Sequence, residues 1–70
     1  MMPLLFANVD EDNVIKKIGG SVQMKHHLEN LGFIPGSSIR VINKSNVNII
    51  VNVKDVRIAI SKELAKKIIV

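Results

Sequence analysis

The 70-residue sequence has no cysteine, tryptophan or tyrosine, and it contains two phenylalanines. Without cysteine the chain forms neither disulfide bonds nor thiolate metal sites, so packing alone has to hold the fold together. The near absence of aromatic rings leaves nucleic-acid bases almost no surface on which to stack. The four glycines are too few and too scattered for a phosphate-binding loop or a dinucleotide-binding fingerprint.

Long apolar runs are absent as well. The N-terminal segment MMPLLFANV is apolar, but it is much shorter than the roughly 20 residues that span a bilayer, and it lacks the basic region and cleavage site of a signal peptide. We therefore expect a soluble cytosolic protein. A chain of this length is expected to form one domain, residues 1–70, which buries only about 60% of the surface that its unfolded chain exposes.

Positive charge exceeds negative charge in the sequence. Ten Lys and Arg against six Asp and Glu give a formal net charge of +4 and a pI near 9.8. This balance suits a polyanion, an acidic membrane surface or an acidic protein partner, and it selects none of them. The basic residues are scattered from Lys16 to Lys67, as on an ordinary solvated surface.

The first half of the sequence predicts one strand and one helix. The segment NVIKKI, residues 13–18, is rich in β-branched residues and is followed by a Gly-Gly pair, so a first strand is expected there. Ser21 suits a helix N-cap, because its hydroxyl accepts a hydrogen bond from a free backbone N–H. The residues at i, i+4 and i+7 that should place one helical face in the core are Met24, Leu28 and Leu31.

The segment LENLGFIPGSSIRV, residues 28–41, changes from a helical period to a strand period. Gly32 stands where a helix would end in the left-handed conformation. Pro35 and Gly36 match the central pair of a type II turn, because proline presets φ and glycine accepts a positive φ. These three residues are predicted to reverse the chain and to fix the angle between the helix and the next strand.

From Ser38 onward the apolar residues alternate with a period of two, which indicates strands with one face in the core. The polar breaks KSN, residues 44–46, and KD, residues 54–55, have hairpin length, so three strands should form an antiparallel meander. Ser61 suits the cap of a short helical turn through KELAK, and the terminal KIIV is expected to form a last strand that closes the sheet. The residues expected to face the core are Ile39, Val41, Val47, Ile49, Val51, Val53, Val56, Ile58 and Ile60.

Short strands in so small a chain favour a closed barrel, because closure removes exposed strand edges. We expect a mostly β fold, namely a small SH3-like antiparallel barrel of about five strands. One α-helix is expected between strands 1 and 2, and a short helical turn before the last strand.

Three segments, taken together, resemble the ferrous iron transport protein A (FeoA) family. They are IGG at residues 18–20, HLENLGFIPG at residues 27–36 and VRIAISKELAKKIIV at residues 56–70, and the resemblance covers nearly the whole chain. The resemblance implies a small cytosolic accessory protein of bacterial ferrous iron uptake that acts by protein–protein contact. Its implied partner is a membrane permease with a cytosolic GTP-binding domain (FeoB-type), and any GTP hydrolysis belongs to that partner. The resemblance does not define the oligomeric state, and we favour a monomer.

Candidate metal ligands and nucleophiles are few. His26 and His27 are adjacent on the expected helix, so their side chains diverge by about 100° and do not easily share one ion. His26 and Glu29 supply two ligands, whereas a stable site generally needs three or four. None of the five serines lies in a nucleophile elbow. We therefore expect a non-enzyme with no catalytic residue, no metal site and no cofactor.

A protein partner would meet side chains that face outward. Ile42 and Ile50 have the opposite parity from the core row, so they are expected to point outward unless the helix or the N-terminal segment covers them. Basic side chains are suited to the rim of such an interface. The candidate partner-binding residues are Lys25, His26, Arg40, Ile42, Ile50 and Arg57. A nucleic-acid-binding SH3-like barrel that contacts phosphates alone is the alternative that the sequence leaves open.

Overall fold

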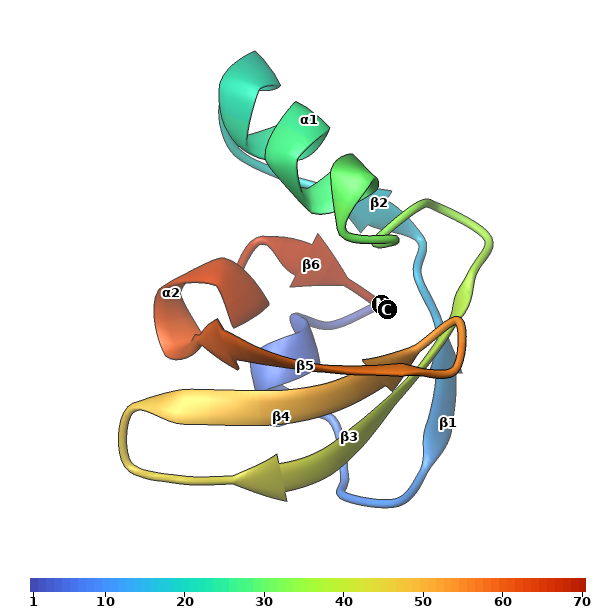
Figure 1. Ribbon diagram of the computed structural model, residues 1–70, viewed down its shortest axis with the longest axis vertical. Coiled ribbons are helices and arrows are strands. Elements are labelled where there is room, and N and C mark those ends of the chain that lie inside the picture. Colours follow the sequence, from blue (N-terminus) through green and yellow to red (C-terminus); the bar gives the residue numbers. More distant parts are fainter.

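The computed structural model describes all residues, Met1–Val70. Six strands form two sheets, a four-stranded sheet in the order β1-β3-β4-β5 and a two-stranded sheet of β2 and β6, with the apolar core between them (Figure 1). The strands are β1 (Asp12–Val14), β2 (Lys17–Ile18), β3 (Ser38–Lys44), β4 (Asn48–Val53), β5 (Val56–Ser61) and β6 (Ile68–Ile69); the helices are η1 (Leu4–Phe6, a 3-10 turn), α1 (Val22–Asn30) and α2 (Lys62–Ala65). These six strands and three short helices confirm the predicted mostly β fold class. No helix has the length and hydrophobicity that a membrane span requires.

The strand predicted at residues 13–18 is two strands with different partners. β1 pairs with β3, whereas β2 pairs with β6. Between them lies Ile15, whose N–H donates to the Ser37 carbonyl at 2.9 Å and whose carbonyl accepts from the Gly36 N–H at 2.8 Å. The predicted single strand is therefore wrong, because a run of β-branched residues does not show that its two ends bond to different segments.

Helix α1 packs against the barrel through a small part of its surface. It begins where predicted, since Ser21 Oγ accepts a hydrogen bond from the Met24 N–H at 3.1 Å. Leu28 is fully buried, Met24 is half-buried and Leu31 is 38% exposed, so the predicted core face is wrong for Leu31. Figure 1 shows the reason: the helix projects from the barrel, with its C-terminal end nearest to it, and Met24 and Leu28 are the helix side chains that pack against the core.

Gly32 ends α1 in the predicted left-handed conformation, with φ +103°. Its N–H donates to the Glu29 carbonyl at 3.0 Å, and the N–H of Phe33 donates to the Leu28 carbonyl at 2.9 Å. This pair of hydrogen bonds is a Schellman motif, which satisfies helix carbonyls that would otherwise lack partners. The next residue, Phe33, is fully buried, so the end of the helix also inserts an aromatic ring into the core.

The predicted turn at Pro35 and Gly36 is present. It is closed by a hydrogen bond from the Ser37 N–H to the Ile34 carbonyl at 3.0 Å, and Gly36 has φ +94°. A positive φ at the third residue is the mark of a type II turn. The turn therefore sends the chain from α1 into β3, as the sequence indicated.

Strands β3, β4 and β5 form the predicted antiparallel meander, with a register shift between Val41 and Asn43. The predicted core row is wrong at two of its members: Val47 lies in the β3–β4 turn and is 72% exposed, and Val56 begins β5 and is 54% exposed. Alternation alone does not show that the core stops before the hairpin ends. Ile58 is half-buried, and the remaining members, Ile39, Val41, Ile49, Val51, Val53 and Ile60, are buried.

The last two predicted elements are also present. Ser61 Oγ accepts a hydrogen bond from the Leu64 N–H at 3.2 Å and thereby caps α2. β6 follows, but it pairs antiparallel with β2 and not with the meander. The last strand therefore closes the barrel through a second sheet.

The N-terminal segment, for which the sequence predicted no element, completes that second sheet. The Met2 N–H donates to the Val70 carbonyl at 2.9 Å, and the Val70 N–H donates to the Met2 carbonyl at 2.8 Å. Leu4 and Ala7, in and after η1, are fully buried. The two ends of the chain are thus joined, and the first residues contribute to the core.

Replacing Gly36 with alanine should destabilise the fold through backbone strain. Nothing lies within 4 Å of the position that a Cβ would occupy, so the cost comes from the positive φ and not from a clash. We expect a loss of about 1–2 kcal/mol in the free energy of unfolding, and a melting temperature lower by roughly 4–16 °C in a domain of this size. Thermal unfolding followed by circular dichroism measures the change.

Gly19→Ala is the matched control for this experiment. Gly19 does not have a positive φ, and a Cβ there would meet the Lys67 carbonyl oxygen at an ordinary 3.5 Å. Its melting temperature should stay near that of the parent. Equal melting temperatures for both variants would contradict the assigned role of the turn.

Candidate protein-interaction site

A row of polar side chains crosses the outer face of the four-stranded sheet. The strand register places Asp12 opposite Arg40, and Arg40 opposite Asn52. Asn52 in turn lies opposite Arg57 of β5. Directly opposed residues of antiparallel strands point to the same side of a sheet. The structure therefore brings two predicted interface residues, Arg40 and Arg57, onto one surface. We call the surface formed by Arg40, Arg57 and Ile50 the sheet surface.

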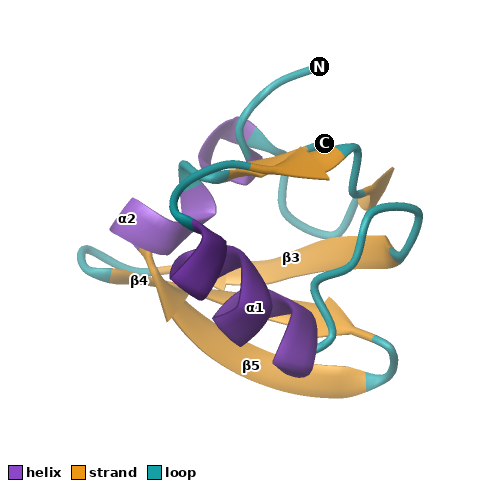
Figure 2. Cartoon of the chain, turned by 90° about the horizontal axis from the view of Figure 1, so that it is seen from above, coloured by secondary structure: helices purple, strands orange, loops and turns teal.

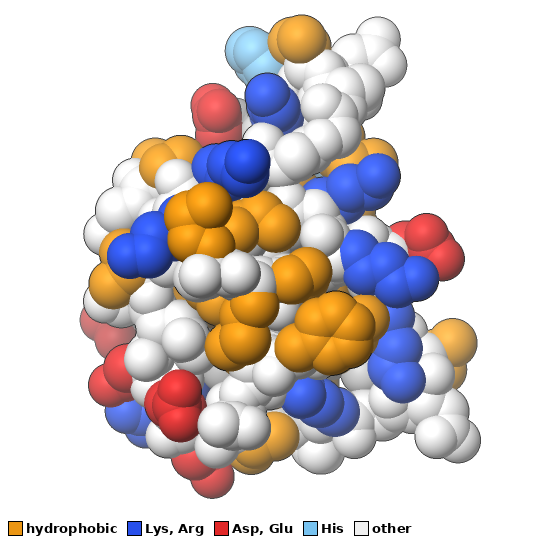
Figure 3. All heavy atoms as spheres, turned by 180° about the vertical axis from the view of Figure 1, so that it is seen from behind, with side chains coloured by type: hydrophobic (Ala, Val, Ile, Leu, Met, Phe, Trp, Pro, Cys, Tyr) orange, Lys and Arg blue, Asp and Glu red, His pale blue; other side chains and the backbone are white.

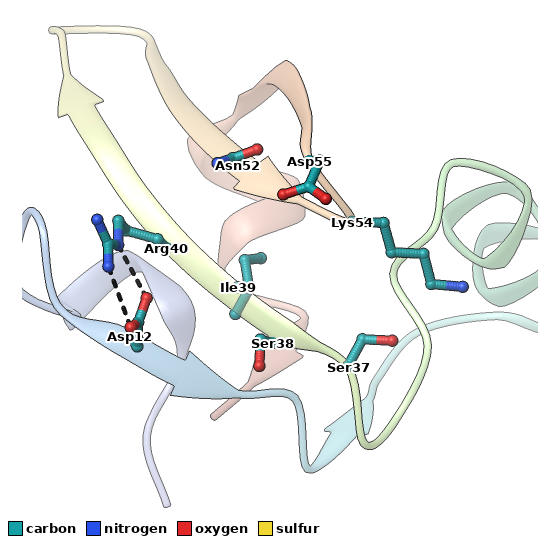
Figure 4. Close-up of a pocket in the computed structure, with 8 residues that line it drawn as sticks. All are labelled: Asp12, Ser37, Ser38, Ile39, Arg40, Asn52, Lys54 and Asp55. Carbon is teal, nitrogen blue, oxygen red and sulfur yellow. Dashed lines mark hydrogen bonds and ion pairs between the residues drawn. The ribbon is translucent and has the colours of Figure 1, made fainter.

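Arg40 is held in place by Asp12 through two parallel hydrogen bonds (Figure 4). Arg40 Nε donates to Asp12 Oδ1 at 2.8 Å, and Arg40 Nη2 donates to Asp12 Oδ2 at 3.0 Å. The hydrogen bond and the positive charge of the guanidinium lower the pKa of the Asp12 carboxyl, and the same contacts raise the pKa of Arg40. Both side chains are exposed, so water screens the pair and its role is to orient Arg40 rather than to stabilise the fold.

An open hollow of about 520 Å³ lies beside this ion pair (Figure 4). Lys54 and Asp55 form its rim, as the central residues of the β4–β5 turn with φ +51° and +61°. Two positive φ values are the geometry of a type I′ turn, which the two-residue spacing of the KD break would have indicated. The hollow offers a polar partner hydrogen-bond donors, hydrogen-bond acceptors, and both positive and negative charges. Its lining residues are Asp12, Ser37, Ser38, Ile39, Arg40, Asn52, Lys54 and Asp55.

Ile42 and Ile50, which the sequence predicts to point outward, are both half-buried. Ile50 lies two residues before Asn52 on β4 and opposite the exposed Ala59 of β5, so it belongs to the sheet surface. Ile42 lies at the register shift of β3, where the alternation on which its prediction depends is interrupted. The structure thus places Ile50 on the sheet surface, whereas Ile42 has no partner in the ladder that defines this surface.

Lys25 and His26 lie in the first half of α1, which runs along the outside of the barrel (Figure 2). Both are exposed, and neither forms an ion pair. Val22, at the start of the helix, is 70% exposed. We call this part of α1 the helix surface. The candidate residues therefore divide between two surfaces, carried by different elements.

Sequence reasoning missed Asp12 and Asn52 as members of the site. Neither belongs to a motif, and the pairing of residue 12 with residue 40 depends on a register between segments far apart in the chain. The pairing of Arg57 with Asn52 could have been predicted from the sequence, because the two-residue KD turn fixes the β4–β5 register. No group of three or more His, Asp or Glu side chains that could hold a metal ion is present in the structure.

The structure is that of a small, mostly β domain with an apolar interior and with its polar groups on exposed surfaces. The chain matches the FeoA domain over residues 2–70. It is 37% identical over 70 residues to the "Putative Fe(2+) transport protein A" of Methanocaldococcus jannaschii, a match that covers 100% of this chain and 85% of the relative. The chain therefore belongs to the FeoA family.

Two solved structures extend the comparison to the fold. The crystal structure of an iron uptake regulatory protein (FeoA) superimposes with a TM-score of 0.88 at 29% identity, covering 96% of this chain and 91% of that one. FeoA of Stenotrophomonas maltophilia, an SH3 domain protein crystallised with zinc, gives a TM-score of 0.84 at 21% identity, covering 99% and 88%. The predicted SH3-like fold is confirmed.

Removing the Arg40 guanidinium should return the pKa of Asp12 to its ordinary range, which is about 3.9. The sign follows from the direction of the shift. Because the folded-state pKa is lowered, the small contribution of this water-screened pair to stability is present at pH values above the ordinary aspartate pKa and is lost as the pH falls through the lowered value. NMR titration of the Asp12 carboxyl carbon in Arg40→Gln measures the shift.

Arg57→Gln is the matched control, because it removes the same charge from the same surface without touching Asp12. The pKa of Asp12 should stay lowered in this variant. If Arg40→Gln left the Asp12 titration unchanged, the assigned cause of the shift would be wrong.

Proposed function

We propose that this chain is a cytosolic, non-enzymatic accessory protein of ferrous iron uptake. It acts by direct contact with the cytosolic part of the GTP-dependent ferrous iron permease (FeoB-type). Membership of the FeoA family supports the role in iron uptake, as do the names of its relatives, which refer to Fe(2+) transport and to iron uptake regulation. GTP binding and hydrolysis belong to the permease.

The observation that carries the contact role is the exposure of α1. This helix is capped at both ends, by Ser21 and by the Schellman motif at Gly32, yet Leu28 is its one fully buried residue. A helix that is ordered before binding presents its side chains to a partner without a further cost in backbone conformational entropy. A partner that covers the helix surface would also bury Val22, whose side chain is mostly in water.

The charge of the chain supports an acidic partner surface. The net charge is +4, and Lys25 lies without an ion-pair partner near the middle of α1. Complementary charges mainly speed association and select the partner, so a change of sign at Lys25 should oppose binding. Arg57 is also without an ion-pair partner, but it lies on the sheet surface and therefore serves as the comparison for Lys25.

Lys25→Glu should weaken capture of the permease's cytosolic region by about five- to tenfold, since it replaces an attractive charge with a repulsive one at the contact. The melting temperature should be nearly unchanged, because the side chain is exposed. Biolayer interferometry with the immobilised cytosolic region measures the affinity. The measurement should be repeated at high salt, where the difference from the parent should shrink.

Arg57→Glu has the same change of charge on the other surface and serves as the comparison. It should bind nearly as the parent does. If Arg57→Glu weakened binding while Lys25→Glu did not, the sheet surface would be the interface. If the parent protein showed no capture, direct contact would be excluded under those conditions.

A further inference from the structure

A group of apolar side chains is exposed on the face of the barrel that is opposite to the view of Figure 1 (Figure 3). The bridge between Pro3 and Ile69, together with the register of β2 and β6, places Pro3, Ile69 and Lys17 side by side on three adjacent segments. Directly opposed residues share one side of a sheet. The neighbouring pair Ile18 and Ile68 is buried, so Pro3, Ile69 and Lys17 lie on the outer side.

The 3-10 turn η1 extends this apolar group. The Phe6 N–H donates to the Pro3 carbonyl at 3.0 Å, which keeps the two residues adjacent. Leu4 is fully buried and Leu5 is half-buried, but Phe6 is 66% exposed and Met1 is 85% exposed. Single exposed apolar residues are ordinary, whereas several that adjoin one another mark an interaction surface. We call this group, Met1, Pro3, Leu5, Phe6 and Ile69, the N-terminal face.

Lysines border the N-terminal face. Lys44 Nζ donates to the Leu5 carbonyl at 3.1 Å, and Lys17 lies opposite Ile69. Lys67 is exposed and lies in the turn directly before β6, so it adds a further positive charge near this face. None of these lysines belongs to an ion pair, since the one ion pair of the structure joins Arg40 and Asp12. In Figure 3 Lys and Arg side chains lie above, to the right of and below the apolar centre of this face, and Asp and Glu side chains lie further out, mainly at its lower left.

We propose that the N-terminal face binds the surface of an anionic lipid bilayer. The exposed ring of Phe6 would enter the headgroup region, and the bordering lysines would lie against lipid phosphates and carboxylates. Apolar residues ringed by lysine are the pattern of interfacial membrane binding, and each lysine near an anionic surface strengthens it about fivefold. The binding is reversible, because it depends on a small apolar area and a few charges.

Two features favour a lipid surface over a protein partner or a second copy of the chain. The arginines, Arg40 and Arg57, lie on the sheet surface, and the basic residues of the N-terminal face are lysines. The lysine ammonium is a compact, hydrated point charge on a flexible stem, which suits mobile lipid phosphates, whereas the fixed fork of arginine matches the defined geometry of a protein carboxylate. A symmetric dimer through this face would bring two sets of uncompensated lysines together, and like charges in contact oppose association.

Binding at the N-terminal face leaves α1 free, because the helix carries none of its residues. Cosedimentation with phosphatidylcholine vesicles, with and without phosphatidylglycerol, tests the proposal on the full chain. We expect sedimentation with the vesicles that contain phosphatidylglycerol, and release at high salt. The vesicles hold no protein, so the result is independent of the proposed contact with the permease.

Two pairs of variants localise the binding. Phe6→Ser should weaken vesicle binding about tenfold, because the variant lacks the ring that binding removes from water. Lys17→Gln should weaken vesicle binding about fivefold, because it removes one positive charge. The matched controls are Val22→Ser, which removes an equally exposed apolar side chain from α1, and Lys54→Gln, which removes a lysine from the β4–β5 turn. Both controls should bind nearly as the parent does, and all four variants should keep the parent's melting temperature.

Three results would overturn the proposal. The first is absent binding, or equal binding to neutral and anionic vesicles. The second is equal behaviour of Phe6→Ser and Val22→Ser. The third is that the parent protein does not bind vesicles, while Phe6→Ser abolishes capture of the permease region or dissociates a dimer seen in sedimentation velocity. The N-terminal face would then be a protein interface.

Discussion

The arrangement of the barrel depends on the backbone of Ile15, which is bonded on both sides to the turn at Pro35 and Gly36. Its N–H donates to Ser37 and its carbonyl accepts from Gly36, while its side chain is buried in the core. At this residue the chain leaves the four-stranded sheet and enters the two-stranded one. A turn of another shape would move the Gly36 N–H away from Ile15. The positive φ of Gly36 and the division of the first strand in two are therefore parts of one constraint.

The same constraint leaves α1 outside the barrel. The chain leaves β2, runs outward to the start of α1 and returns through the helix to Gly32, just before the turn, so the C-terminal end of α1 lies at the barrel while its N-terminal end projects (Figure 1). The interior, by contrast, is wholly apolar, with no buried polar side chain. The core takes two side chains from α1, the buried Leu28 and the half-buried Met24. The exposed side chains of the helix are available to a partner.

Features with local causes could be predicted from the sequence, and features that depend on distant pairing could not. Ser21, Gly32 and the Pro35–Gly36 turn act on residues nearby in the sequence, so their roles could be predicted from the sequence pattern. The N-terminal pairing with Val70 and the contact of Asp12 with Arg40 join segments far apart in the chain. Periodicity identified strands but not the limits of the core, which is why exposed residues at hairpin ends were assigned to the interior. The division of the interface candidates between two surfaces likewise required the register of the sheet.

The central claim is that the helix surface is the contact for the permease. Titration of the ¹⁵N-labelled chain with the unlabelled cytosolic region of the permease, followed by amide chemical shifts, tests it most directly. The account predicts shift changes concentrated on α1, Val22–Asn30, with small changes at residues 3–6 on the N-terminal face. An unchanged spectrum, or changes centred on residues 3–6 or on the sheet surface with α1 unaffected, would contradict it.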